Sequence, residues 1–372
     1  MKILFFSSFA HLVLEKSQSR TSGGAELQVA LLARELAALG EEIVIAGGDV
    51  GQADRVVING VMTRSAGKFH TGRVFEMVAA IPRVVRVLRE ERPEWVVVMG
   101  WTAWLFILWA LRPFVGYKLD FICALDSEIN GEYRRENPIF GSLFEFAMRR
   151  CDVRHSITRD QAEVFKKGAM DCTFYRYLLV PRGAPPRITE KTIDLLWVSR
   201  CHPIKRPHLF LDLAEALPET RCRMICPCED RELWNSVTVR ASKLPNLEFI
   251  EKVPYHEVQE HYDPAKIFVN TSTFEGFPNS FIQAALGKTA LLSMRVDPDG
   301  MIREFGSGVL AGDSGAALFM SAKQMLSDEA MLARMQEGNA RMITEWLDNS
   351  SNVEKFLSGL KTVGEGAGRD ET

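Results

Sequence analysis

The sequence lacks an apolar run long enough to cross a membrane. Its longest uncharged apolar stretch is WVVVMGWTAWLFILWAL at 95–111, whereas a membrane-spanning helix needs about 20 such residues. Gly100 divides the stretch, so we expect a buried strand at 96–99 and a core helix at 102–111, which Arg112-Pro113 ends. The composition therefore indicates a globular protein.

An excess of positive charge is also missing. The chain has 45 Lys and Arg against 48 Asp and Glu, which gives a formal net charge of −3. Nucleic-acid-binding proteins are usually strongly basic, so we expect no nucleic-acid partner. The length of 372 residues suggests two domains, and the 47% hydrophobic content is ordinary for globular proteins.

Metal-binding and redox signatures are absent as well. Cys222, Cys226 and Cys228 lie close together, but no second Cys-x-x-Cys and no nearby His pair accompanies them. The dinucleotide fingerprint G-x-G-x-x-G does not follow the first strand, so NAD is not indicated. We expect no metal and no cofactor. The opening MKILFF does not resemble a signal peptide, which favours a cytoplasmic protein with free thiols.

What the sequence does contain is a regular alternation of strand and helix patterns in both halves. PRGAPP at 181–186 interrupts this alternation and predicts an interdomain linker. We therefore predict an α/β fold with two doubly wound, Rossmann-like domains. The predicted segments are 1–183 for the first domain, 187–345 for the second, and 346–372 for a C-terminal helix that returns toward the first domain and has a frayed tail.

One stretch, IFVNTSTFEGFPNSFIQAALGKTALLSM at 267–294, predicts a strand, a loop, a helix and a second strand. Its apolar, β-branched start indicates a buried strand, and the Ser, Thr, Gly and Pro that follow indicate a loop. Asn279 or Ser280 can cap the helix, and Gly287 can end it. The predicted bounds are 267–270 for the first strand, 271–278 for the loop and 289–292 for the second strand.

Polar side chains gather where two predicted strands of the second domain end. Glu275 lies in the loop after the first of these strands, where ligands of open α/β sheets bind. Its carboxylate can accept hydrogen bonds from sugar hydroxyls, and the start of the following helix can hold a phosphate. Arg200 and Lys205 follow the strand at 195–199 and offer a planar fork and a point charge for phosphate oxygens.

This pattern resembles the donor-binding signature of the family 4 retaining glycosyltransferases. Glu275 to Pro278 match the family's Glu-Gly-Phe/Leu-Pro, and Gln283 stands where most members carry a second Glu. Arg200 and Lys205 match the family's basic pair. The resemblance covers 23–299 and implies the GT-B fold, in which two Rossmann-like domains face each other across a cleft.

The resemblance also implies a role for each matching residue. Arg200 and Lys205 would stabilise the leaving diphosphate, Glu275 would hold sugar hydroxyls, and Gln283 would bind a ribose hydroxyl. Asp126 stands where relatives place a polar residue that reaches the donor sugar. The donor-binding residues implied by the resemblance are Gly23, Gly24, Gly276, Phe277, Pro278, Asn279, Ser280 and Gln283.

Each of these residues also has a purely local interpretation. Glu275 can be favoured by the helix dipole alone, and Gln283 can form a capping box with Ser280. Asp126 can make a local turn bond. The basic pair can belong to an ordinary surface loop, and Gly23-Gly24 to a plain strand-to-helix turn.

The expected function is transfer of a sugar from a nucleotide-sugar to a saccharide or lipid-linked acceptor, in envelope or capsule polysaccharide synthesis. A nucleotide-sugar 2-epimerase and a non-catalytic nucleotide-sugar-binding protein are the alternatives. The helix predicted at 74–92 is rich in arginine, with Arg83, Arg86 and Arg89. That helix is either a solvated surface or a peripheral docking face for anionic lipid at the inner side of a membrane.

Overall fold

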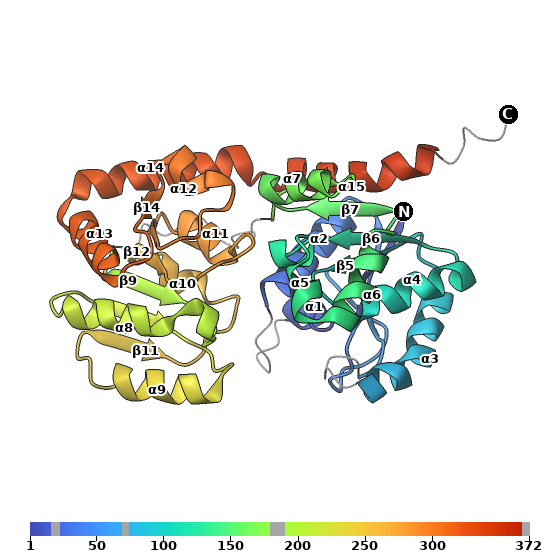
Figure 1. The fold of residues 1–372 in the computed structure, drawn as a ribbon, viewed down its shortest axis with the longest axis horizontal. Helices are drawn as coiled ribbons and strands as arrows, with labels where there is room; N and C mark the ends of the chain where they lie inside the picture. Colours follow the sequence, from blue (N-terminus) through green and yellow to red (C-terminus); the bar gives the residue numbers. More distant parts are fainter. Residues whose placement is uncertain (16–22, 69–73, 179–189, 367–372) are drawn as a thin grey trace. The chain divides into compact units, whose positions relative to one another are not determined.

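The computed structural model describes residues 1–15, 23–68, 74–178 and 190–366. The chain divides into two compact units, the first Met1–Val180 with Asp348–Thr372 and the second Pro181–Leu347 (Figure 1). The predicted linker at 181–186 lies outside the described residues.

In its described part, the first unit contains an eight-stranded sheet in the order β3-β4-β2-β1-β5-β6-β7-β8, with only the β3–β4 pair antiparallel. Most of the strands are buried on both faces, as their near-continuous apolar sequences predict. The strands are β1 (Lys2–Phe6), β2 (Glu42–Gly47), β3 (Val56–Ile58), β4 (Val61–Ser65), β5 (Trp95–Met99), β6 (Lys118–Ile122), β7 (Val153–Ser156) and β8 (Thr173–Phe174). The helices are α1 (Ala10–Leu14), α2 (Gly24–Ala38), α3 (Val74–Glu91), α4 (Trp104–Val115), α5 (Glu132–Glu136), α6 (Pro138–Met148), α7 (Arg159–Lys167), α15 (Asn349–Gly366) and the 3₁₀ turn η1 (Asp126–Glu128).

The second unit contains a six-stranded parallel sheet in the order β11-β10-β9-β12-β13-β14, counted over its described residues. The strands are β9 (Ile193–Val198), β10 (Cys222–Ile225), β11 (Leu247–Ile250), β12 (Ala265–Asn270), β13 (Ala290–Ser293) and β14 (Gly308–Leu310). The helices are α8 (Pro207–Ala216), α9 (Arg231–Ala241), α10 (Gln259–Tyr262), α11 (Asn279–Leu286), α12 (Met301–Phe305), α13 (Gly315–Ser327), α14 (Glu329–Trp346) and the 3₁₀ turns η2 (Pro203–Lys205) and η3 (Pro298–Gly300). The predicted fold class of two doubly wound α/β domains is confirmed.

The winding direction reverses once in each sheet, and this reversal positions the candidate site. In the first unit the chain winds outward from β1 through β2, then returns to add β5 on the other side of β1. In the second unit β9 has β10 on one side and β12 on the other. Ligands of open α/β sheets bind outside the carboxyl ends of the strands at such a switch point. The loops at which a ligand is expected therefore follow β1 and β5 in one unit and β9 and β12 in the other.

Helix α4 corrects one predicted boundary. The helix does not end at Arg112-Pro113 but runs through Pro113 to Val115. The proline ring removes one helix hydrogen bond, but Trp109 packs edge-on against Phe146 of α6, with ring centroids 4.9 Å apart. The helix is closed by Gly116, which has φ +85° and donates its N–H to the carbonyl of Arg112. The packing of the last turns therefore stabilises the helix by more than the proline destabilises it.

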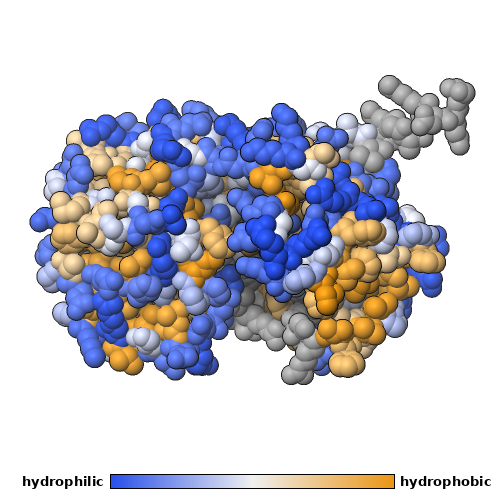
Figure 2. Space-filling model, viewed as in Figure 1, coloured by the Kyte–Doolittle hydropathy of each residue, from blue (hydrophilic) through white to orange (hydrophobic). Residues whose placement is uncertain are grey.

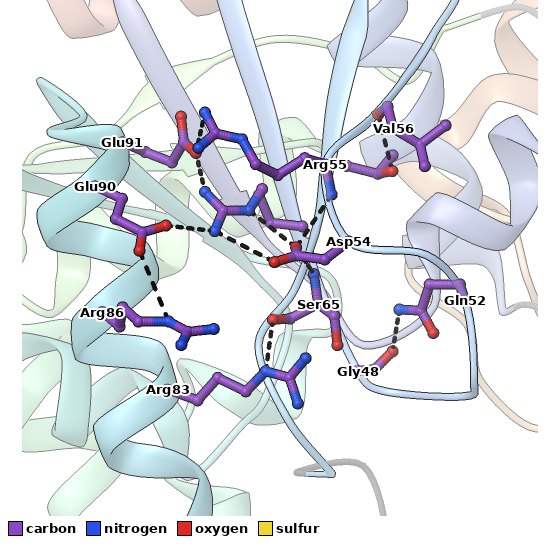
Figure 3. A network of polar contacts seen from close by, with 12 residues as sticks. Gly48, Gln52, Asp54, Arg55, Val56, Ser65, Arg83, Arg86, Glu90 and Glu91 are labelled. Atoms are coloured by element: carbon purple, nitrogen blue, oxygen red, sulfur yellow. Dashed lines mark hydrogen bonds and ion pairs between the residues drawn. The ribbon is translucent and has the colours of Figure 1, made fainter.

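An ion network around the buried side chain of Arg64 ties β4 to α3 in the first unit (Figure 3). The side chain of Arg64 is only 1% exposed, and its Nη2 lies 2.7 Å from Glu90 and its Nε 2.9 Å from Asp54. It also pairs with Glu91, which accepts a second ion pair from Lys2 at 3.1 Å. Burying several charges together is costly unless each has partners, and here each carboxylate has at least one.

Helix α15 packs on β7 and β8, two strands that are far from it in the sequence (Figure 1). The ring of Phe356 stacks on that of His155, and its carbonyl oxygen lies 3.2 Å from Nε2 of the same histidine. His155 Nδ1 in turn lies 2.9 Å from Asp120. Burial raises the pKa of Asp120. A fully buried polar pair at the sheet edge is therefore covered by the last helix of the described chain.

Candidate functional site

The centre of the candidate site is an ion pair at the switch point of the second unit. Lys205 ends η2 in the loop after β9, and Glu275 lies in the loop after β12. The Lys205 Nζ lies 2.7 Å from Glu275 Oε2, and the two side chains are 15% and 16% exposed. Two residues 70 positions apart in sequence meet because β9 and β12 are neighbouring parallel strands.

The two loops that carry this pair are joined by hydrogen bonds. The hydroxyl of Thr271 donates to the carbonyl of Lys205 at 2.6 Å, and the N–H of Thr273 donates to the carbonyl of Ile204 at 2.9 Å. Arg206 donates its Nε–H to the carbonyl of Thr271 at 2.6 Å. Arg206 has φ +46°, a strained conformation for a side-chain-bearing residue. The backbone is thus fixed on both sides of Lys205.

Two neutral donors orient the carboxylate of Glu275. The hydroxyl of Ser272 donates to its Oε1 at 2.7 Å, and Asn270 Nδ2 lies 3.3 Å from the same oxygen. Both donors are buried. The sequence interpretation missed Asn270 and Ser272, although polar residues at the end of an apolar strand were a visible signal. With these donors and Lys205, Glu275 is held as an acceptor for further hydrogen bonds.

Helix α11 begins one or two residues earlier than predicted, at Asn279. Its N-cap is Pro278, and no side chain caps it, so neither Asn279 nor Ser280 is the N-cap. The capping box between Ser280 and Gln283 is therefore wrong, because it requires Ser280 at the N-cap. A proline has no side-chain oxygen to satisfy the first amides of the helix. An uncapped helix start of this kind suits a phosphate group.

Gln283 lies one turn into α11 with its side chain 7% exposed. Burial raises the pKa of the Tyr255 hydroxyl, and the side chain of Gln283 lies beside that hydroxyl. The Gln283 carbonyl accepts a hydrogen bond from Gln259 Nε2 at 3.1 Å. The other motif residues Gly276, Phe277 and Pro278 are all buried in the loop that leads to the helix.

Arg200 is placed differently from Lys205. Its Nη1 lies 2.7 Å from Glu229 Oε1, and its side chain is 50% exposed. The sequence treated Arg200 and Lys205 as one basic pair, but the structure pairs each with a different carboxylate. A half-exposed arginine in a surface pair is free to exchange its partner for a ligand at little cost.

The remaining predicted site residues belong to the first unit. Gly23 is the N-cap of α2, and Gly24 is the first residue of that helix. Asp126 begins η1 in the loop after β6, and its side chain is exposed. Their predicted roles toward the donor stay predictions.

Within the described ranges, no three His, Cys, Asp or Glu side chains are grouped so that they could hold a metal ion. None of the described helices has the length and apolar content that crossing a membrane requires.

Comparison with known families decides the identity of the chain. Residues 23–183 match the model of the glycosyl transferase 4-like domain, and residues 192–328 match that of the glycosyl transferases group 1. The chain belongs to glycosyltransferase family 4. No curated protein sequence matches this glycosyltransferase.

Solved structures with the GT-B fold resemble the glycosyltransferase over nearly its whole length. Sucrose-phosphate synthase from Thermosynechococcus elongatus has a TM-score of 0.79 at 12% identity, covering 98% of this chain and 100% of its own. WaaG, a glycosyltransferase involved in lipopolysaccharide biosynthesis, has a TM-score of 0.67 at 16% identity, with 95% and 98% covered. An E. coli trehalose-6-phosphate structure bound with UDP-2-fluoro glucose has a TM-score of 0.66 at 14% identity, with 96% and 99% covered.

Substitutions at Gln283 test its predicted role in this glycosyltransferase. We expect Gln283→Glu to be tolerated, since a carboxylate also accepts a hydrogen bond from a ribose hydroxyl. Gln283→Leu should raise the donor KM about tenfold, because one hydrogen bond is worth about 1 to 1.5 kcal/mol. Steady-state kinetics with varied donor give the KM values, and thermal melts control for folding. A normal donor KM in a well-folded Gln283→Leu protein would contradict the prediction.

Proposed function

We propose that this glycosyltransferase moves a sugar from a nucleotide-sugar to a hydroxyl of a saccharide or lipid-linked saccharide, with retention of the anomeric configuration. The observation that carries this proposal is the Lys205–Glu275 ion pair at the switch point between β9 and β12. The E. coli neighbour bound with UDP-2-fluoro glucose supports a UDP-sugar as the donor class.

In this proposal, binding of the donor breaks the Lys205–Glu275 ion pair, and each of the two side chains then binds a different part of the donor. The diphosphate takes the ammonium group of Lys205, and the first amides of α11 contribute further donors to it. Glu275 is then free to accept hydrogen bonds from sugar hydroxyls, while Ser272 and Asn270 keep its carboxylate oriented. The half-exposed Arg200 can leave Glu229 and add a second cation to the diphosphate.

The chemical step forms one bond and breaks one. The acceptor hydroxyl oxygen bonds to the anomeric carbon as the bond from that carbon to the diphosphate oxygen breaks. The hydroxyl proton passes to the leaving diphosphate, which departs as a nucleoside diphosphate. Negative charge grows on the leaving group, so fixed cations and amides stabilise the transition state more than the bound donor. Attack on the face from which the diphosphate leaves gives retention.

Incubation with a panel of labelled nucleotide-sugars tests the proposal. We expect release of nucleoside diphosphate with one donor, and transfer to an acceptor with the anomeric configuration kept in proton NMR of the product. An inverted linkage would remove the retaining mechanism. Isomerised sugar without nucleotide release would indicate an epimerase, and binding without any product would indicate a non-catalytic protein.

We also propose that the acceptor belongs to envelope or capsule polysaccharide and that the enzyme contacts an anionic membrane peripherally. WaaG, described as involved in lipopolysaccharide biosynthesis, supports the first part. For the second, apolar side chains gather over α3 and α4 (Figure 2), and Arg86 is 60% exposed on α3. Arg83, in contrast, pairs with Asp49 and donates to the Ser65 carbonyl. Equal flotation of the parent and an Arg86→Glu, Arg89→Glu variant with anionic vesicles would argue against this contact.

A further inference from the structure

The first unit has its own switch point, between β1 and β5, and a large aromatic residue lies there. Trp101 lies just after Gly100 in the loop that follows β5, and β5 lies beside β1 as β12 lies beside β9 in the second unit. The same rule that places a ligand at the ends of β9 and β12 places one at the ends of β1 and β5. In the proposed function the donor binds to the second unit, and Trp101 has no role yet.

Trp101 is exposed, but its ring packs against a second aromatic ring. Its side chain is 45% exposed, and its ring lies 4.6 Å from that of Tyr133, centroid to centroid. Tyr133 in turn packs edge-on against Phe144, which is 1% exposed in the core of this unit. The two rings are tilted by 49° to each other. An aromatic ring that is packed against a second aromatic and still nearly half exposed offers a stacking surface with little side-chain freedom left to lose on binding.

The backbone of Trp101 is fixed by a buried carboxylate. Glu128, 6% exposed, accepts the N–H of Trp101 at 2.9 Å with one oxygen and the N–H of Ala124 at 2.9 Å with the other. It thus joins the loop after β5 to the loop after β6. Burial raises the pKa of Glu128 to about 7, and the backbone N–H bonds act against that rise. Burying an ionisable group to hold two loops is costly, which argues that their relative position matters.

We propose that Trp101, supported by Tyr133 and held by Glu128, is the stacking platform for the saccharide ring of the acceptor. A pyranose has an apolar C–H face that covers an aromatic ring and a polar edge of hydroxyls. The exposed polar side chain of Asn130, in the adjoining loop after β6, can meet those hydroxyls. This inference rests on the proposed function, because it names the subsite for the acceptor of that reaction.

Saturation-transfer NMR with methyl glycosides of glucose, galactose, mannose and N-acetylglucosamine tests the platform. With the full chain, we expect saturation of the ring C–H protons of at least one probe. Trp101→Ala should weaken its affinity about tenfold or more, as truncating an aromatic anchor does, whereas Trp101→Phe should keep most of it. Phe114→Ala is the matched control, because Phe114 is 76% exposed in the same unit but lies at the far end of α4.

The outcomes separate this inference from the proposed function. Equal glycoside binding by the parent and Trp101→Ala overturns the platform, as does the absence of saturation for every probe. An equal loss in Phe114→Ala also overturns it. Release of nucleoside diphosphate from the donor without acceptor, measured on the same variants, should be unchanged by Trp101→Ala. If no donor is cleaved although glycoside binding depends on Trp101, the proposed function fails and the saccharide platform stands.

Discussion

Replacing Lys205 by alanine is expected to lower kcat roughly 10- to 150-fold, with a smaller change in the donor KM. A hydrogen bond to a charged group is worth about 1.5 to 3 kcal/mol, which sets this range. The charge on the leaving diphosphate is greatest in the transition state, so the loss falls mainly on kcat. The variant should fold, because Glu275 keeps its hydrogen bonds from Ser272 and Asn270. Stopped assays at saturating donor and acceptor, with thermal melts, measure both quantities.

Arg200 and its partner supply the comparison for this experiment. If Arg200 also binds the diphosphate, Arg200→Ala should lower kcat by a similar factor, and Arg200→Lys should be impaired because the planar fork is lost. Glu229→Ala breaks the same surface ion pair from the other side and should leave kcat unchanged. Near-normal turnover in a well-folded Lys205→Ala protein would take the diphosphate role away from this residue and remove most support for the proposed mechanism.

Replacing Arg64 by methionine is expected to lower the free energy of unfolding of the first unit by about 3 to 5 kcal/mol. Methionine fills much of the same volume, so the loss comes from the charges left behind. Glu91 is 5% exposed and would lose Arg64, its buried partner, while keeping its ion pairs with Lys2 and the exposed Arg55. For a unit of this size the melting temperature should fall by roughly 6 to 20 °C, measured by differential scanning calorimetry.

Arg86→Met is the matched control for the Arg64 experiment. Arg86 also pairs with Glu90, at 3.7 Å, but the two side chains are 60% and 40% exposed. Exposed pairs of this kind contribute under about 0.5 kcal/mol, so the melting temperature should hardly change. Equal stability of the two variants would show that the buried network does not stabilise the unit more than a surface pair does.

Elements whose boundaries depend on local sequence were predicted well. The strands predicted at 96–99 and 267–270 end where β5 and β12 end, because the apolar run gives way there to a glycine or to polar residues. The end of α4 was mispredicted, because a proline signal is local whereas the contact of Trp109 with Phe146 joins two helices. The N-cap of α11 was also mispredicted, since Ser280 suits a cap by residue type but the chain already turns at Pro278.

In the candidate site, the sequence predicted which residues carry the chemistry but not which of them contact each other. Lys205 and Glu275 were both found in the sequence, each from its place after a strand. Their ion pair was not predicted, because it depends on β9 and β12 being neighbours. Arg200 was grouped with Lys205 because both follow the same strand and match the family's basic pair, but Arg200 precedes the 3₁₀ turn η2, Lys205 ends it, and each has its own partner. Sequence identifies chemistry-bearing residues, whereas sheet order decides which of them meet.

The return of α15 to the first unit has a consequence for how the chain is made. Phe356, which covers His155, lies 201 residues after it. At translation rates of 5 to 20 residues per second, about 10 to 40 s pass between the synthesis of these two residues. During that interval the second unit can complete its fold, while the β7–β8 edge and the Asp120–His155 pair are not yet covered by α15. The first unit is therefore synthesised first but completes its fold last. Until α15 is made, chaperones can bind the uncovered β7–β8 edge, and a wrong strand can pair with it.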